Sequence, residues 1–353
     1  MWPSRGRKGN YAYACARVRA KKSLLLTKDN YPKFLLMDLN EIGRFLGETQ
    51  YQVEMSSLAS RWDGVNLIEL GTSRNLARVY SEILGFTKGD LHEMVAGYLA
   101  RWDAWNIKTI LRGKYYGASI DDIKEDLVAA GELSEDDLNK LVALGSVKEV
   151  LEALRKVGGA QFSEEMVGSV ERSGTLAQIE DHLDRAYYEK LVSTINRRTK
   201  AGQVFYSYVA REIDAVNVMT LMKCKREGLA ADRIAGFYVP GGDEINQKEF
   251  VRLAAVEGTD QLISELAKLR MYEDVKESFE AFKRTGSLSD VSSALQRYTL
   301  KSAGKFSHVY PLSVLPVLDY IIRKKIEVDN IRIIARGKES GMDPEVIKKL
   351  LVI

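Results

Sequence analysis

The polar residues best placed to do chemistry in this 353-residue chain belong to one short string that occurs three times. Each copy holds an acidic residue, an Asn three positions later and a Gly fourteen positions after the acid. The acid, Asn and Gly of the three copies are Asp103, Asn106 and Gly117; Asp214, Asn217 and Gly228; and Glu327, Asn330 and Gly341. Carboxylates accept hydrogen bonds and pair with cations, and amides donate and accept hydrogen bonds, so the elements that carry them decide what they bind.

The spacing within the string places its polar residues on one side of a helix. At 100° per residue, Asp103, Asn106, Ile110 and Lys114 share a face. The aliphatic residue predicts that this face is packed, and an unpaired buried amide would cost roughly 1–3 kcal/mol. We therefore expect each Asn to be hydrogen-bonded, and each helix to end near the Gly, a natural C-cap.

Two interpretations of the string remain open. In the first, the Asn fixes the register between helices, and the Lys eleven positions after the acid lies along the surface or pairs with an acid. In the second, the three lysines line a shared surface that binds acidic groups of a partner. These lysines are Lys114, Lys225 and Lys338.

The rest of the chain reads as helix. It has only six prolines, whereas an all-β chain needs turn residues roughly every 8–12 positions. Apolar residues recur at helical spacing, as along residues 147–154. A short polar residue three positions before an acid, as at Ser134 and Asp137, marks a helix start. The chain is predicted to be all-α.

The repeated string also divides the chain. Its acidic residues stand 111 and 113 residues apart, so three periods nearly fill the sequence. A second string recurs, once before each copy of the first, at residues 39–46, 147–156 and 275–284. We expect three similar helical modules, at residues 1–117, 118–228 and 229–353. Extra loop residues around 240–242 distinguish the second from the others.

Composition and motifs argue against an enzyme. The net charge of +3 is nearly neutral, which disfavours a nucleic-acid binder. No phosphate-binding loop or G-x-S-x-G elbow is present, and the three histidines lie far apart. Cys15 and Cys224 are too few for a four-thiolate zinc site. We expect no catalytic residue, cofactor or metal. We expect no membrane span either, because two prolines and an aspartate interrupt the richest apolar run, residues 309–322.

Two further features could serve an interface. The basic run over residues 17–22, which includes Arg17 and Arg19, is either a solvated helix face or a contact for acidic partner groups or lipid head groups. Trp102 and Trp105 are either core residues or exposed aromatic anchors.

The triplicated pattern is acid-x-x-Asn followed by [Arg/Lys]-x-Lys-x-x-Gly. Near the start of the chain it is preceded by the sequence YAYACARVR at residues 11–19. Together they resemble the C subunit of archaeal A-type ATP synthases, the counterpart of the d subunit of V-type ATPases, over essentially the whole chain. The resemblance implies a funnel of three modules around a pseudo-threefold axis. One end would sit on the membrane ring of proteolipid subunits, and the cavity would receive the D and F subunits of the central stalk. Such a protein is a non-catalytic rotor part at the cytoplasmic face of the membrane that links ion-driven rotation to ATP synthesis or hydrolysis.

Two other classes fit parts of the sequence. A cytosolic helical-repeat scaffold unrelated to a rotary motor would share the modules but not the membrane partners. An enzyme or nucleotide-binding protein with an unusual site would be stabilised by its ligand. The residues we expect to contact partners are Arg17, Arg19, Lys114, Lys225 and Lys338.

Overall fold

The computed structural model describes residues 8–157 and 176–353, and in these two ranges every regular element is a helix. This confirms the all-α prediction. The helices are α1 (Tyr11–Lys22), α2 (Asn30–Leu36), α3 (Leu39–Gly47), α4 (Gln52–Leu58), α5 (Gly64–Phe86), α6 (Gly89–Leu99), α7 (Arg101–Tyr116), α8 (Ile120–Glu125), α9 (Glu135–Ala143), α10 (Val147–Val157), α12 (Ala177–Thr194), α13 (Lys200–Arg226), α14 (Ala231–Ala235), α15 (Gln247–Ala255), α16 (Gly258–Leu266), α17 (Tyr272–Thr285), α18 (Ser289–Val309), α19 (Leu315–Glu339) and α20 (Pro344–Leu350).

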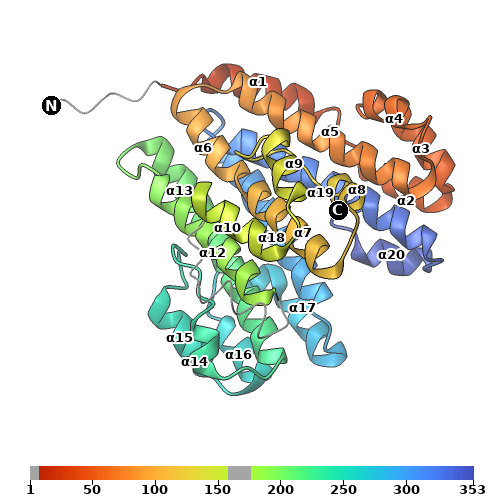
Figure 1. Cartoon of the computed structure of the whole chain (residues 1–353). Helices are drawn as coiled ribbons and strands as arrows, with labels where there is room; N and C mark the ends of the chain where they lie inside the picture. The colour runs from red at the N-terminus through yellow and green to blue at the C-terminus, as the bar shows by residue number, and fades with distance from the viewer. Residues whose placement is uncertain (1–7, 158–175) are drawn as a thin grey trace.

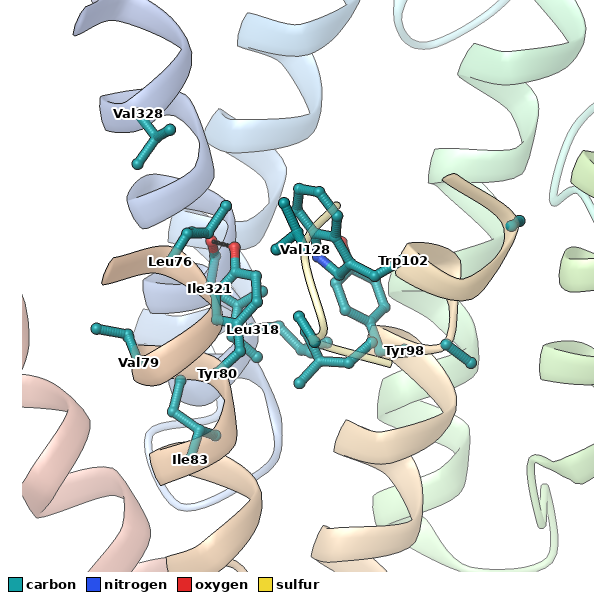
Figure 2. Packing of buried hydrophobic residues seen from close by; sticks show 14 of the residues in the cluster. Leu76, Val79, Tyr80, Ile83, Tyr98, Trp102, Val128, Leu318, Ile321 and Val328 are labelled. Carbon is teal, nitrogen blue, oxygen red and sulfur yellow. Dashed lines mark hydrogen bonds between the residues drawn. The ribbon is translucent and has the colours of Figure 1, made fainter. Parts of the chain in front are cut away.

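The long helices form the frame of the molecule. The repeated string lies on α7, α13 and α19; α7 packs against α12, α13 against α18, and α19 against both α5 and α18. Figure 2 shows the core between α5 and α19, where the Tyr80 hydroxyl donates to the Ile321 carbonyl at 2.8 Å, with Trp102 of α7 close by. The 27 residues of α13 span about 40 Å, so the frame has two well-separated ends.

The glycine of each string ends its helix or the turn that follows it. Gly117, Gly228 and Gly341 have φ angles of +72°, +69° and +67°. Only Gly adopts this left-handed conformation without a steric cost, so the predicted C-caps are confirmed. A short helix begins within three residues of each glycine: α8, α14 or α20.

Each of these short helices belongs to a lobe, and the three lobes lie at one end of the frame. Lobe 1 is α8–α10, lobe 2 is α14–α17, and lobe 3 is α20 together with α2–α4. Lobe 3 therefore draws on both ends of the chain, and Figure 1 shows the red-orange α2 next to the blue α20. Lys338 joins the two parts, because its Nζ donates to the Leu35 carbonyl at 2.8 Å. The module boundaries at residues 117 and 228 stay a prediction.

Candidate partner-binding site

Each Asn of the repeated string binds the backbone N–H and carbonyl of one residue of its own lobe. The Asn106 side chain donates to the Val128 carbonyl at 2.8 Å and accepts from the Val128 N–H at 2.9 Å. Asn217 binds Val239, and Asn330 binds Val352, through the same two bonds. All three asparagines are buried, and each bound Val lies 22 positions after its Asn. The Asn residues are therefore hydrogen-bonded, as predicted, and they fix each lobe to its long helix.

The first two acids of the string hold the peptide that leads into the next lobe helix. Asp103 accepts from the N–H groups of Glu132 and Leu133, just before α9. Asp214 accepts from three successive N–H groups, those of residues 243–245, just before α15. Burial raises the pKa of Asp214 to about 6, although these backbone donors oppose the shift. The chain passes so close to both carboxylates that a Cβ on Gly131 or Gly242 would collide with them. The extra loop of module two is therefore part of this contact.

The third acid has different partners. Glu327 accepts from the Leu26 N–H at 2.5 Å, from the Tyr51 hydroxyl at 2.6 Å and from the Gln50 amide at 3.0 Å. It also pairs with Lys324, whose Nζ lies 3.0 Å away. Leu26 stands just before α2, so the N-terminal segment takes the place that the downstream chain has in lobes 1 and 2.

Lys324 is fully buried in this cluster. Its ammonium lies 3.9 Å from the centre of the Tyr51 ring, a cation–π contact. Burial lowers the pKa of Lys324 to about 8, because the nearby Glu327 carboxylate only partly offsets the loss of hydration. The third lobe is thus held by a buried ion pair, whereas in the described part of the chain Asp103 and Asp214 accept from backbone N–H groups.

The five predicted partner-contacting cations lie in different places. Arg17 and Arg19 are exposed on α1, at the end of the frame away from the lobes, and Arg19 donates to the Pro311 carbonyl. Lys225 donates to the Val256 carbonyl at 2.6 Å and Lys338 to Leu35, so both serve lobe packing. Lys114 is half-buried near the end of α7. The structure does not bring the three lysines together on one surface, and their role in partner binding stays a prediction.

A central cavity lies between the string-bearing helices. Its outer chamber, of about 660 Å³, lies between α7 with lobe 1 and the C-terminal half of α19. A second chamber, of about 310 Å³, lies among the long helices α7, α13, α18 and α19, and we call it the inner chamber. The two adjoin, since they share Gln296, Lys325, Ile326 and Asp329. The outer chamber lies beside the C-terminal parts of α7 and α19, from which lobe 1 and the α20 part of lobe 3 begin.

The inner chamber contains a buried carboxylate with four donors. Glu212 accepts from the hydroxyls of Tyr98 and Tyr188, each at 2.9 Å, and from Tyr208 at 3.2 Å. Arg101 pairs with Glu212 at 2.7 Å while its guanidinium lies over the Tyr98 ring. Burial raises the pKa of all three tyrosines well above 10. This network joins α6, α7, α12 and α13, and it makes the floor of the cavity rigid.

The outer chamber presents aromatic and arginine side chains. Trp105 is 45% exposed and Tyr116 is 79% exposed, whereas Trp102 is buried in the core. Two wall arginines are held by acids, Arg112 by Glu180 at 2.6 Å and Arg336 by Glu69. Arg332 keeps a buried Nε without a partner in the described part of the chain. Exposed Trp, Tyr and Arg in a concave wall are the residue types that dominate binding energy at protein interfaces.

Sequence reasoning found only part of this wall. It named Trp105 as a possible anchor but missed Tyr116, Arg332 and Arg336. The last two lie on the same string-bearing helix as Glu327, at the positions that turn toward the cavity. A helical projection of residues 327–341 would have shown arginines four residues apart next to the packed face.

Three further features of the described residues concern the cysteines, the potential metal ligands and the apolar runs. Cys15 and Cys224 are buried free thiols. No group of three or more potential metal ligands occurs within residues 8–157 and 176–353. In the same ranges, no helix combines the length and apolar character that a membrane span requires. Of the apolar run 309–322, the part from Leu315 to Ile321 is buried, while Val309 and Leu312 are exposed.

The fold and the cavity define an all-α protein whose central space is lined by aromatic and arginine side chains. Residues 14–350 match the model of the family described as ATP synthase (C/AC39) subunit. The chain is 39% identical over 346 residues to the C subunit of the A-type ATP synthase of Methanosarcina acetivorans, covering 98% of this chain and 93% of that one. It is 35% identical over 347 residues to the same subunit of Haloferax volcanii, covering 98% of both chains. The chain belongs to the ATP synthase (C/AC39) subunit family, which confirms the resemblance. These comparisons give no support to a scaffold unrelated to a rotary motor.

Proposed function

We propose that this chain is the C subunit of an A-type ATP synthase and acts as a non-catalytic rotor part at the cytoplasmic face of the membrane. Its partners are the proteolipid ring of the membrane sector and the D and F subunits of the central stalk. The protein passes torque between them, so that ion-driven rotation is linked to ATP synthesis or hydrolysis. Membership of the family supports a place in the ATP synthase complex, and the cavity supports a role as a socket for the stalk.

The observation that carries the socket proposal is the cavity at the lobe end. A shaft that transmits torque needs a rigid wall and a large contact. The wall is rigid because ion pairs join α7 to α12 and α19 to α5, as at Lys108–Asp184 and Arg336–Glu69. The contact has exposed Trp105 and Tyr116 as anchors. We propose that the end of the D–F stalk fills the outer chamber.

In the test, the purified chain is mixed with the D–F pair and with the detergent-solubilised ring. Light scattering then measures which complexes form. Wild-type protein should form a complex in which one copy joins ring and stalk. Trp105→Ala and Tyr116→Ala should each weaken stalk binding at least about 30-fold, the effect of losing a hot-spot residue. Tyr13→Ala, an exposed aromatic at the opposite end, is the matched control and should bind the stalk normally. Unchanged stalk affinity in both cavity variants would overturn the proposal.

A further inference from the structure

The end of the frame opposite the lobes is built from four chain segments, residues 8–17, 86–93, 195–200 and 305–312, which we call the loop end. Gly9 and Tyr11 both donate to the Asp90 carboxylate, at 2.6 and 2.8 Å, so the first two segments are joined. Asp90, His92 and Glu93 line one cleft together with Asn196 and Thr199. Arg19, just beyond the first segment, donates to the Pro311 carbonyl at 3.0 Å and joins the fourth. In Figure 1 the loop end lies at the upper left, near the start of α1 and of α13.

The loop end is basic, although the whole chain is nearly neutral. Its seven cations outnumber its two acids, Asp90 and Glu93, and Asp90 is already occupied by Gly9 and Tyr11. All seven cations are exposed, and in the described parts of the chain none of them pairs with an acid. These cations are Lys8, Arg17, Lys88, Arg197, Arg198, Lys200 and Lys305.

Many cations on the rest of the surface are paired with acids. Ion pairs join helices all around the frame and the lobes, for example Lys190–Glu132, Lys301–Asp274 and Arg270–Asp243. Like charges gathered without counter-charges repel one another, so a surface that keeps them exposed favours an anionic partner.

Exposed apolar side chains accompany these cations. Tyr13, Val309 and Leu312 are 53%, 67% and 63% exposed. Arg17 donates to the Tyr13 hydroxyl and lies 4.6 Å from the centre of the Phe86 ring, so its guanidinium sits at an aromatic surface. Nucleic-acid phosphates would need the cations but not the aliphatic groups. Cations, a tyrosine and aliphatic side chains at one level are typical of a surface that meets lipid head groups.

We infer that the loop end binds anionic phospholipid head groups directly. The cations meet the phosphates, and Tyr13, Val309 and Leu312 enter the interfacial layer. The cavity lies toward the other end of helices about 40 Å long, so it stays open to a stalk while the loop end touches the bilayer. Lipid binding of this kind is a property of the isolated chain and requires neither ring nor stalk.

The test is co-sedimentation of the purified chain with vesicles of phosphatidylcholine alone or mixed with an equal amount of phosphatidylglycerol. Binding should require phosphatidylglycerol and fall steeply as salt is added. The triple variant Arg197→Gln, Arg198→Gln, Lys200→Gln should bind about 100-fold more weakly, because each cation near an anionic surface contributes about fivefold. The control, Lys28→Gln, Lys33→Gln, Lys349→Gln, removes three exposed lobe 3 cations and should bind like wild type.

Three outcomes would overturn the inference. The first is equal binding to both kinds of vesicle, and the second is an equal loss of binding in the two triple variants. The third is that the chain does not bind vesicles but binds the purified ring through Arg197, Arg198 and Lys200. The last outcome would assign the loop end to a protein partner. Stalk binding is read from the cavity variants, so the lipid inference and the socket proposal fail separately.

Discussion

In the first two lobes and in the third, the acid of the repeated string holds a different kind of chain segment. In lobes 1 and 2, Asp103 and Asp214 hold a peptide about 30 positions further along the same chain. In lobe 3, Glu327 holds Leu26, which is 301 positions away. Closing a tenfold longer loop costs about 2 kcal/mol more in chain entropy. In the two short loops, backbone donors alone hold the chain to the carboxylate. In lobe 3, Tyr51 and Gln50 of the N-terminal segment also donate to Glu327, and Lys324 pairs with Glu327.

The Asn sites show no such difference. Asn106, Asn217 and Asn330 each make the same pair of bonds to a residue 22 positions on. The polypeptide is continuous between Asn and Val in every copy, so the same local solution works three times. Chain continuity, rather than position in the repeat, decides which contacts need reinforcement.

The largest expected effect is loss of the third acid. Glu327→Gln leaves the buried Lys324 ammonium without its counter-charge, which should lower the free energy of unfolding by about 3–5 kcal/mol. Asp214→Asn, the matched change in lobe 2, should cost only about 1–2 kcal/mol because no buried cation is left behind. Urea unfolding gives both values. Hydrogen exchange should show residues 26–36 losing protection only in the Glu327 variant, and equal costs would refute the contrast.

A second prediction uses the pKa of Lys324, about 8 in the folded chain against an ordinary 10.5. Between these values the unfolded chain binds more protons, so the contribution of Lys324 to stability rises with pH. The difference in unfolding free energy between wild type and Lys324→Met should therefore increase by up to about 3 kcal/mol from pH 8 to pH 10.5. Groups common to both proteins, including the tyrosines, cancel in this difference. A flat difference would show that Lys324 titrates normally.

The asparagine variants should have smaller effects than Glu327→Gln, and the three should be alike. Asn106→Ala, Asn217→Ala and Asn330→Ala each leave a buried Val N–H and carbonyl unpaired, at a cost of about 1–3 kcal/mol. Thermal and urea unfolding of the three variants would measure this. If Asn330→Ala were as damaging as Glu327→Gln, chain continuity would not be what separates the two kinds of site.

The sequence predicted the local parts of this architecture well. Helical periodicity, the C-cap glycines and the buried Asn residues all follow from rules that act within a few turns. The partner of each Asn was not predicted, because the bound Val contributes only its backbone, although a Val 22 positions after each Asn is visible in all three copies. The change from Asp to Glu in the third string was the one visible sign that this copy is different.

The candidate site was harder to foresee. The exposure of Trp105 depends on how lobe 1 stands against α19, and Arg332 and Arg336 reach the cavity only through that arrangement. The basic run at residues 17–22 was recognised, yet its members have separate roles. Lys21 pairs with Glu82 and Lys22 with Asp319, while Arg17 faces outward. Composition located the charge, but only the fold shows which cations are left without a counter-charge.

The composition of lobe 3 has a consequence for how the protein is made. A ribosome that adds about 5–20 residues per second needs roughly 15–60 s to proceed from Leu26 to Glu327. During that time Tyr31 and Phe34, which are buried in the finished protein, have emerged without α20 to cover them. The segment that leaves the ribosome first is therefore completed last. A nascent chain that stalls before residue 327 exposes an apolar surface, which makes the N-terminal helices the natural substrate of a holding chaperone.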